Sequence, residues 1–452
     1  MSAPRHYTLP SSPNIKCQDR FSLLEDEEDV YEVRFWDIFQ VILQSPVSSA
    51  NQIIEILDTI AVTLRDGQTM DYGGLKQVLE EWPNILQLWP TLVQMALKMP
   101  ELFPGDCISI LTTETPVLMF SREQVCCLVV HQFFCTLRAP VWQDGYQDFD
   151  LWYSKEQPHD RAATIYLNSL LTYFSRCATL VQDGDWKVSY SLRVLNDADQ
   201  RPHRLIPLEI VQVSEVSTCE DLVGLSGNAC VVSANRYVGF GQSATQEEIF
   251  VGTCPEACPI VLVTPPLEDN QVLIVKGAEG MVETEGQRRD IRVVGPYRQY
   301  PDVELHQDKW RNRTMLFMDA LELDLAEGDG LADLLPANVR REKMKALNAF
   351  TSGEYGSVSV GFWGCGAFNG DAEVKMLILW CAASAAGTTL RVVCDEGQRK
   401  FGKKLEDVVG IVVQKAMTAQ QLESILLLKE AGQLAKGEMF SFLMDHMSST
   451  QQ

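Results

Sequence analysis

The chain has 452 residues, of which 46% are hydrophobic and 22% are charged. This composition excludes wholesale disorder, and the length is sufficient for two or three folded domains. With 38 basic and 61 acidic residues the formal net charge is −23, which argues against a protein that binds DNA or RNA through a basic surface.

The N-terminal segment is polar and ends in an acidic run at residues 25–29. The first twenty residues lack the apolar core of a signal peptide, so we expect a protein that is not secreted. Residues 1–30 are predicted to form an acidic flexible tail. The most apolar helical stretch, residues 376–387, is shorter than the ~20 residues that span a bilayer, and we expect a buried helix and no membrane association.

The cysteines and histidines give no local pattern for a metal site. None of the thirteen cysteines forms a CxxC pair, and the pairs at 126–127 and 254–258 have no histidine at ligand spacing. We therefore expect no metal, and we interpret the cysteines as reduced thiols of a protein in the nucleus and cytoplasm.

Residues 31–183 are predicted to form an all-helical accessory region. Apolar residues recur at three- and four-residue intervals in the runs FWDIFQVIL, IIEILDTIAVTL, LKQVLEEW, VCCLVVHQFFCTL and IYLNSLLTYF. Ser121 is the expected N-cap of the fourth run, followed by Glu123 and Gln124 in its first turn. His131 lies within this apolar run, and we interpret it as a hydrogen-bonded core residue.

Residues 184–445 show the pattern of an α/β domain. Short runs rich in β-branched residues predict strands, and helical patterns follow residues 245, 371 and 418; the strand runs are KVSYSLRV, LEIVQVSEV, ACVVSANRYV, IVLVTPP, QVLIVKGAE, SVSVGF and TTLRVVC. Residues 357–394 have the spacing of a right-handed βαβ crossover. The expected fold class is α/β, with a mixed sheet flanked by helices.

Two glycine-containing loops lie between a predicted strand and a predicted helix, at residues 238–241 and 361–366. Loops of this kind allow backbone N–H groups to approach a diphosphate at a helix N-terminus, although most such glycines form plain turns. Neither loop is followed by the Gly-Lys-Ser/Thr of a P-loop.

The first loop leads to the sequence Gln246-Glu247-Glu248. Adjacent helical residues point about 100° apart, so the two carboxylates cannot flank one bond as a usual glycosidase pair does. One carboxylate is therefore the candidate for proton transfer and the other for positioning. Acidic residues in a first helical turn also stabilise the helix dipole, which is the alternative explanation for this pair.

Several motifs in the order of this sequence resemble those of the poly(ADP-ribose) glycohydrolase family. The loop and Gln-Glu-Glu resemble its signature, and similar motifs extend over roughly residues 115–430, among them TCED at 218–221, CPE at 254–256, KGAE at 276–279 and WGCGAF at 363–368. The resemblance implies a macrodomain with a helical accessory region that hydrolyses ribose–ribose O-glycosidic bonds.

The resemblance also implies roles for single residues. Glu248 is the expected general acid and base, and Glu247 orients the scissile ribose. Asn235 and Gln246 complete the ribose site, and Glu220 matches an adenine-contacting acid. The remaining substrate-binding residues implied are Gly239, Phe240, Gly241, Gly364, Cys365, Gly366, Ala367 and Phe368. No cofactor is implied, and the expected partners of this monomer are poly(ADP-ribose) and the proteins that carry it.

This sequence departs from the family pattern at several positions. The middle glycine of the first loop is Phe240, whose ring either displaces the loop or covers the ribose, and only four residues separate Gly241 from Gln246. Gln287 takes the place of an aromatic residue that stacks on adenine, and Phe362 that of an asparagine. These departures leave two alternatives: a binding module with impaired catalysis, and an acidic scaffold protein.

Overall fold

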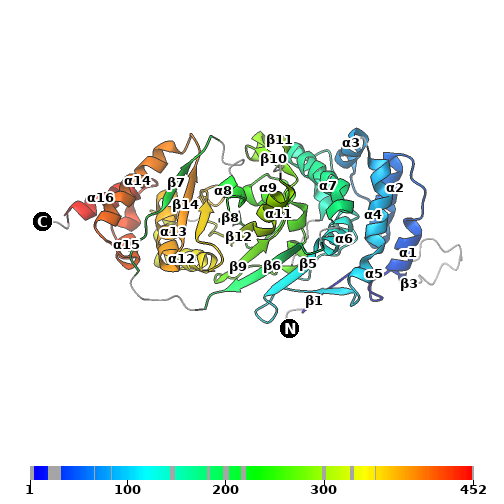
Figure 1. Cartoon of the computed structure of the whole chain (residues 1–452), viewed down its shortest axis with the longest axis horizontal. Coiled ribbons are helices and arrows are strands. Elements are labelled where there is room, and N and C mark those ends of the chain that lie inside the picture. Colours follow the sequence, from blue (N-terminus) through cyan, green and yellow to red (C-terminus); the bar gives the residue numbers. More distant parts are fainter. Residues whose placement is uncertain are drawn as a thin grey trace. The chain divides into compact units, whose positions relative to one another are not determined.

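The computed structural model describes residues 5–18, 32–65, 67–82, 84–142, 148–180, 184–196, 203–214, 220–297, 302–325, 330–351 and 353–449. Packing divides the chain into two compact units (Figure 1). Unit 1 comprises residues 1–189, 239–265 and 278–299, and unit 2 comprises residues 190–238, 266–277 and 300–452. The loop at 239–245 and the helix after it thus belong to the unit that contains the N-terminal helices. The contiguous domain bounds expected from the sequence stay a prediction.

Unit 1 is mainly helical, although residues 31–183, expected to be all-helical, also contain three short strands in their described part. Its helices are α1 (Phe35–Ile42), α2 (Ala50–Leu64), α3 (Gly73–Glu81), α4 (Ile85–Leu97), α5 (Met99–Leu102), α6 (Arg122–Phe133), α7 (Asp160–Leu180), α9 (Gln246–Gly252) and α10 (Ile260–Val263), with 3-10 turns η1 (Phe149–Trp152), η2 (Pro255–Ala257) and η3 (Arg288–Asp290). Its strands are β1 (His6–Thr8), β2 (Lys16–Gln18), β3 (Glu32–Arg34), β4 (Cys107–Ser109), β5 (Val117–Ser121), β10 (Val282–Glu285) and β11 (Arg292–Pro296).

Part of the expected N-terminal tail is folded. Strand β1 pairs antiparallel with β4, strand β2 pairs with β3, and Leu9 between them is fully buried. Burial of apolar side chains such as Tyr7 and Leu9 stabilises a segment that its Pro and Ser content suggests is flexible. The acidic run at 25–29 lies outside the described residues.

Helix α6 begins where the sequence predicts. The Ser121 hydroxyl accepts the N–H of Gln124 at 3.1 Å, and the Gln124 side chain accepts the N–H of Ser121 at 3.0 Å, which is a complete capping box. His131 on this helix is fully buried, with Nδ1 2.7 Å from the Thr136 hydroxyl and Nε2 3.0 Å from the carbonyl oxygen of Ala96. The interpretation of His131 as a core residue is confirmed.

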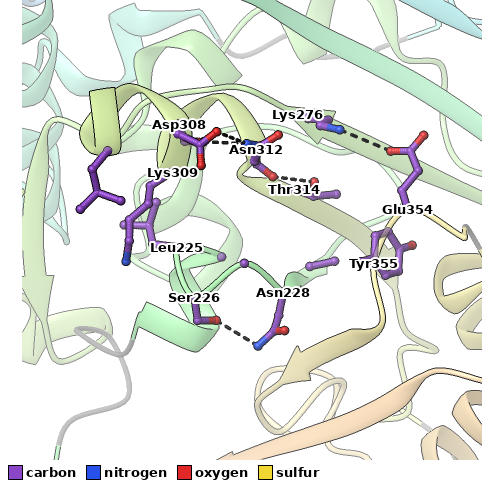
Figure 2. A pocket seen from close by; sticks show the side chains of 14 residues that line it. Leu225, Ser226, Asn228, Lys276, Asp308, Lys309, Asn312, Thr314, Glu354 and Tyr355 are labelled. Carbon is purple, nitrogen blue, oxygen red and sulfur yellow. Dashed lines mark hydrogen bonds and ion pairs between the residues drawn. The ribbon is translucent and has the colours of Figure 1, made fainter. Parts of the chain in front are cut away.

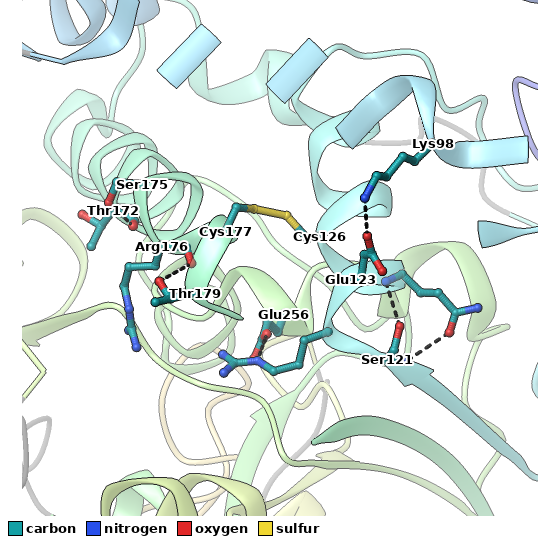
Figure 3. Close-up of a disulfide and its surroundings, with 12 residues drawn as sticks. Lys98, Ser121, Glu123, Cys126, Thr172, Ser175, Arg176, Cys177, Thr179 and Glu256 are labelled. Atoms are coloured by element: carbon teal, nitrogen blue, oxygen red, sulfur yellow. Dashed lines mark hydrogen bonds and ion pairs between the residues drawn. A yellow bond between two sulfur atoms is a disulfide. The ribbon is translucent and has the colours of Figure 1, made fainter. Parts of the chain in front are cut away.

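Helices α6 and α7 are joined by a disulfide between Cys126 and Cys177, which the expectation of reduced thiols did not include (Figure 3). The two cysteines are 51 residues apart in sequence. They meet because the apolar faces of α6 and α7 pack together, and sequence spacing does not reveal such a pairing. None of the other ten cysteines of the described segments forms a disulfide.

A buried ion network connects these helices to the segment that follows α9. Arg122 of α6 donates to Glu256 and Glu279, both at 2.7 Å, and Arg176 of α7 contacts Glu279 at 2.7 Å. The Arg122 guanidinium also lies 4.0 Å from the centre of the Trp186 ring. Burial raises the pKa of Glu256, and the charge of Arg122 opposes this rise. The acids of the CPE and KGAE motifs are therefore structural partners of α6.

Unit 2 is an α/β fold around a mixed sheet. Its strands are β7 (Glu209–Gln212), β8 (Ala229–Ala234), β9 (Gln271–Lys276), β12 (Thr314–Asp319), β13 (Ser357–Val360) and β14 (Thr389–Cys394), and β6 (Lys187–Val194) enters it from unit 1. With β5 included, the strand order of this sheet among the described residues is β5-β6-β9-β12-β8-β13-β14-β7. From β12 to β7 all neighbours are parallel, whereas β9 is antiparallel to β12.

The helices of unit 2 contact this sheet or pack on one another. They are α8 (Glu220–Val223), α11 (Val303–Asn312), α12 (Pro336–Phe350), α13 (Ala372–Ala386), α14 (Arg399–Gln414), α15 (Ala419–Leu426) and α16 (Met439–Ser449), with 3-10 turns η4 (Ala332–Leu334) and η5 (Ala431–Gln433). Helix α13 is buried along nearly its whole length, and strands β13 and β14 on either side of it are parallel neighbours. The predicted buried helix and βαβ crossover are confirmed. None of the helices in the described part of the chain combines the length and hydropathy needed to cross a membrane.

Two sequence-based assignments of secondary structure need correction. The run IVLVTPP was expected to form a strand, but its first four residues form the single helical turn α10. This turn follows Pro259, and its side chains are buried. Strand β12, with the sequence TMLFMD, was not expected, although it lies beside β8. Short apolar runs without alternation fit a buried helix or a buried strand equally well, so their neighbours in the fold decide.

Candidate functional site

Residues 235–245 connect β8 to α9, and the loop at 239–245 leads into the first turn of α9, which contains Glu248. Thr245 is the N-cap of α9, and its N–H and hydroxyl donate to Glu248 Oε2 at 2.9 and 3.1 Å. Glu248 is partly exposed. The contact with Thr245 fixes one oxygen of the carboxylate at the start of its own helix.

Gly241 passes directly beside the other oxygen of Glu248. A Cβ atom at Gly241 would lie 1.9 Å from Glu248 Oε1, which is far below any van der Waals contact. Position 241 therefore requires glycine as long as Glu248 keeps this conformation. The sequence pattern placed this glycine in the loop but gave no indication of its contact with the carboxylate.

Glu247 points to the beginning of the same loop. Its side chain is buried, and Oε1 accepts the N–H of Gly239 at 2.9 Å. The two neighbouring carboxylates thus have separate contacts, as the 100° offset between successive helical residues predicts. In this conformation Glu247 holds the backbone of the loop.

Phe240 packs inside unit 1. Its side chain is 6% exposed, and its ring centre lies 5.0 Å from that of Phe149 and 5.3 Å from that of Trp152. The sequence left two positions for this ring, one that displaces the loop and one that covers a ribose. In the structure the ring packs against aromatic side chains of η1. The aromatic side chain anchors the loop to η1, and burial of such a ring stabilises the loop conformation.

Trp152 gives this anchor a polar contact as well. Its indole N–H donates to the carbonyl oxygen of Gly241 at 2.8 Å, and its ring lies 5.1 Å from that of Tyr166. Desolvation by burial and the nearby charge of Glu248 raise the pKa of Tyr166. Neither aromatic residue carries a sequence signal for this role, because each is far from the loop along the chain.

Two further hydrogen bonds hold the middle and the end of the loop. Gln242 Nε2 donates to the carbonyl of Leu151 at 3.2 Å, and the N–H of Arg288 donates to the carbonyl of Ala244 at 2.9 Å. Gln246 begins α9 and is partly exposed. The loop is therefore fixed along its length although it is short.

Asn235 and the second glycine loop of unit 2 lie at the carboxyl ends of parallel strands. Asn235 follows β8, and its Nδ2 donates to Glu322, which follows β12, at 3.1 Å. The N–H of Leu323 donates to the carbonyl of Phe368, in the loop after β13, at 3.0 Å. The carboxyl ends of parallel strands are the usual place for ligands in α/β sheets. Glu322 was not among the expected residues because no motif includes it.

The second glycine loop runs from β13 to α13 and contains residues 364–368. Gly364 has φ of +73°, and a Cβ there would lie 2.8 Å from the Cβ of Ala320. Trp363 is buried and donates to the carbonyl of Met318 at 2.8 Å. Gly366 and Ala367 are exposed, whereas Cys365 and Phe368 are partly buried. The first residues of the loop are therefore packed against the sheet, whereas Gly366 and Ala367 in its middle are accessible.

A buried lysine lies beneath this second loop. Lys375 of α13 is fully buried and donates to Glu342 at 2.7 Å, and its Nζ lies 5.2 Å from the centre of the Trp363 ring. A Cβ at Gly370 would lie 2.6 Å from Lys375 Cε. Because both charges are buried, loss of either Lys375 or Glu342 would leave the other charge unpaired and destabilise the structure under the loop.

Glu220 occupies the first position of α8, where its carboxylate contacts Lys309 of α11 at 3.2 Å. Lys309 lines a cavity of about 440 Å³ (Figure 2). Ala229 and Thr314, the first residues of β8 and β12, also line it. This cavity therefore lies at the opposite end of the parallel strands from Asn235. Lys276, which also lines it, pairs with Glu354 at 3.5 Å.

No group of three or more possible metal ligands occurs among the residues that the structure describes. The groups brought together around α9 are carboxylates, backbone amides and aromatic rings. A carboxylate in such a position can transfer a proton to or from a bound ligand.

Comparison with known proteins agrees with this architecture. Residues 82–191 match the profile described as the helical domain of poly(ADP-ribose) glycohydrolase, and residues 199–400 match the profile of its macro domain fold. Poly(ADP-ribose) glycohydrolase 1 of Caenorhabditis elegans is 24% identical over 377 residues, covering 78% of this chain and 44% of that protein. The chain thus spans less than half of the worm protein.

Two further similarities come from a plant protein and a viral structure. Poly(ADP-ribose) glycohydrolase 1 of Arabidopsis thaliana is 23% identical over 413 residues, covering 74% of each chain. A solved alphavirus P23pro-zbd structure has a TM-score of 0.26 and 10% identity, covering 73% of this chain and 40% of its own, and supports no argument about fold. Because two profiles of one family match consecutive parts of the sequence, the chain belongs to the poly(ADP-ribose) glycohydrolase family.

Proposed function

We propose that this chain hydrolyses ribose–ribose O-glycosidic bonds of poly(ADP-ribose) and releases ADP-ribose. The observation that supports this proposal most is the position of Glu248, whose carboxylate is fixed between Thr245 and Gly241 at the start of α9. The relatives named as poly(ADP-ribose) glycohydrolases support the choice of substrate.

In the proposed reaction Glu248 acts first as an acid and then as a base. It donates a proton to the leaving 2′-oxygen as the ribosyl C–O bond breaks and an oxocarbenium-like ribose forms. The resulting carboxylate then takes a proton from the attacking water, which restores the acid and adds the hydroxyl to the sugar. Glu247 keeps the loop in place, and Asn235 and Gln246 are proposed to contact the ribose.

Backbone amides of the second glycine loop, residues 364–368, are proposed to bind the diphosphate, and the N-terminus of α13 follows this loop. In the first loop the N–H of Gly239 already donates to Glu247, so Gly239 and Gly241 are proposed to shape the site rather than to donate to phosphate. N–H groups at the start of a helix attract phosphate without a basic surface. Glu220 and Phe368 are proposed to contact the adenosine and the terminal ADP-ribose. We further propose a monomer that acts in the nucleus and cytoplasm on poly(ADP-ribosyl)ated proteins.

Replacement of the proposed acid tests this function. Glu248→Gln is expected to lower kcat for ADP-ribose release at least ~100-fold, because general acid–base catalysis contributes a factor of this order, while the Kd for polymer stays unchanged. Glu430→Gln removes an exposed carboxylate just before η5 and serves as the matched control. Release of ADP-ribose by Glu248→Gln at the control rate contradicts the assignment.

One observation favours a second candidate, a binding module with impaired catalysis. Both polar groups of Thr245 donate to one oxygen of Glu248, so the carboxylate has stable contacts without a substrate. Under this alternative the wild-type chain binds ADP-ribose in calorimetry but releases none from automodified protein. Absence of both binding and release would leave only the scaffold protein considered from the sequence.

A further inference from the structure

The hairpin formed by β10 and β11 ends in an exposed basic turn. Arg288 and Arg289 lie in η3 at this turn, and both are exposed. Arg161, exposed at the start of α7, donates from Nη1 to the carbonyl of Arg289 at 3.3 Å. We call Arg161, Arg288 and Arg289 the arginine tip.

The guanidinium groups of the arginine tip have no acidic partner in the described segments. Arg292, four positions after Arg288, pairs instead with Glu285 across the hairpin. In a chain with a net charge of −23, an unpaired group of three arginines is unusual and favours an external anion.

The backbone of the tip is fixed to the loop that carries the candidate acid. The N–H of Arg288 donates to the carbonyl of Ala244, four residues before Glu248. Gly286 has φ of +74°, and a Cβ there would lie 2.4 Å from the carbonyl oxygen of Asp290, so the turn is tight. Ile291 on its far side is fully buried. The side chains of Arg288 and Arg289 therefore start from a tight turn whose backbone contacts the loop.

Charge determines which ligand suits this surface. Poly(ADP-ribose) carries a diphosphate in each unit, and the planar guanidinium group binds phosphate oxygens in pairs. The net negative charge of the chain repels such a polymer at a distance, but at 0.1 M salt screening leaves mainly the charges within about 10 Å. A local group of arginines can thus bind a polyanion on an acidic protein.

We propose that the arginine tip binds diphosphates of the polymer outside the ADP-ribose unit that is being released. This inference rests on the proposed function and adds to it a second place of polymer binding, beside the loop of Glu248. The tip therefore favours polymer over free ADP-ribose and increases the salt dependence of polymer cleavage.

Charge reversal in the full-length chain tests the proposal. Arg288→Glu with Arg289→Glu is expected to lower kcat/KM for long poly(ADP-ribose) about 10-fold through KM, with kcat unchanged. The slope of log(kcat/KM) against log salt should become shallower by roughly 0.7 for each phosphate that the variant no longer neutralises. The Kd of monomeric ADP-ribose in calorimetry should not change.

The matched control reverses two exposed basic residues of α14, Arg399→Glu with Lys400→Glu, and alters net charge equally. It should keep the wild-type kcat/KM and salt slope, and Arg288→Lys with Arg289→Lys should keep most of the affinity. Should the double Glu variant of the tip fail to fold, Arg161→Glu on α7 provides the same test at a different backbone position.

Two outcomes overturn the inference. One is a tip variant whose KM and salt slope equal those of the wild type or of the α14 control. The other is an equal loss of affinity for polymer and for monomeric ADP-ribose, which would assign the tip to the monomer pocket. If the wild type releases no ADP-ribose, the proposed function fails, whereas polymer binding by the same variants in calorimetry still decides the role of the tip.

Discussion

Trp152 connects the helical region to the candidate acid through a single hydrogen bond. Its indole N–H holds the carbonyl of Gly241, and the Cα of Gly241 faces the carboxylate of Glu248. Trp152 is fully buried, so the carbonyl that it holds has little access to water. Loss of a buried hydrogen-bond partner costs about 1–3 kcal/mol, which is enough to change the conformation of a short loop.

Trp152→Phe keeps an aromatic ring beside Phe240 but removes the donor. We expect kcat for ADP-ribose release to fall about 10-fold with KM nearly unchanged, because the loop that positions Glu248 loosens while the residues of unit 2 that are proposed to bind the substrate are untouched. Steady-state kinetics and a thermal melt measure both effects.

Trp89→Phe is the control for this change. Trp89 is a buried tryptophan of α4 that packs 5.4 Å from Phe134, and its stability cost should resemble that of Trp152→Phe. An equal loss of kcat in the two variants would mean that Trp152 supports only the stability of the helical region.

At the scale of elements, α6 packs against α7, and α7 contacts α9, the helix that carries Glu248. The disulfide between Cys126 and Cys177 closes a loop of 51 residues, and Arg176 and Glu256 of the buried ion network come from the same region of unit 1 (Figure 3). Closing a loop of this length restricts the unfolded chain, which stabilises the folded state by up to about 4 kcal/mol in the chain-entropy account.

Removal of this cross-link should lower stability more than removal of a neighbouring buried thiol that forms no disulfide. We expect Cys177→Ala to reduce the free energy of unfolding by about 2–4 kcal/mol in urea titrations without reductant. The buried free thiol Cys127 is the neighbour of Cys126 on α6, and Cys127→Ala should cost less. A reductant should lower the wild-type midpoint to that of Cys177→Ala; an unchanged wild-type midpoint would show that the pair is not oxidised.

At the scale of the whole molecule, buried His131 makes folding stability depend on pH. Burial lowers the pKa of His131 from its usual 6.5 to about 4, against the hydrogen bond to the Ala96 carbonyl, which favours the charged form. Between these two values the unfolded chain binds a proton that the folded chain does not. Stability therefore falls as pH falls from about 6.5 to 4, and the contribution is complete above 6.5.

His131→Gln should remove this part of the pH dependence. A difference between 6.5 and about 4 corresponds to roughly 3 kcal/mol, so the wild type should lose about that much more stability than the variant between pH 7 and pH 4. Urea unfolding at several pH values measures the difference. Parallel curves for the two proteins would show that His131 becomes protonated in the folded state without cost.

Elements with capping residues or a clear apolar periodicity in their own sequence could be predicted from the sequence alone. The capping residue Ser121, the helix after residue 418, the strand β6 and the crossover through α13 all follow from patterns within a few residues. The pattern failed for β12 and α10, because short apolar runs acquire their conformation from neighbouring elements. The folded part of the N-terminal segment likewise depends on the distant partner strand β4.

By itself, the sequence determined the fold class and the pair Glu247–Glu248, because periodicity and a motif are contained in adjacent residues. Only the tertiary structure decided what those residues contact: that Phe240 packs beside Trp152, that Gly241 touches Glu248, and that Cys126 meets Cys177. Most such contacts join residues separated by tens of positions, and they form only when helices and loops pack, so no local pattern encodes them.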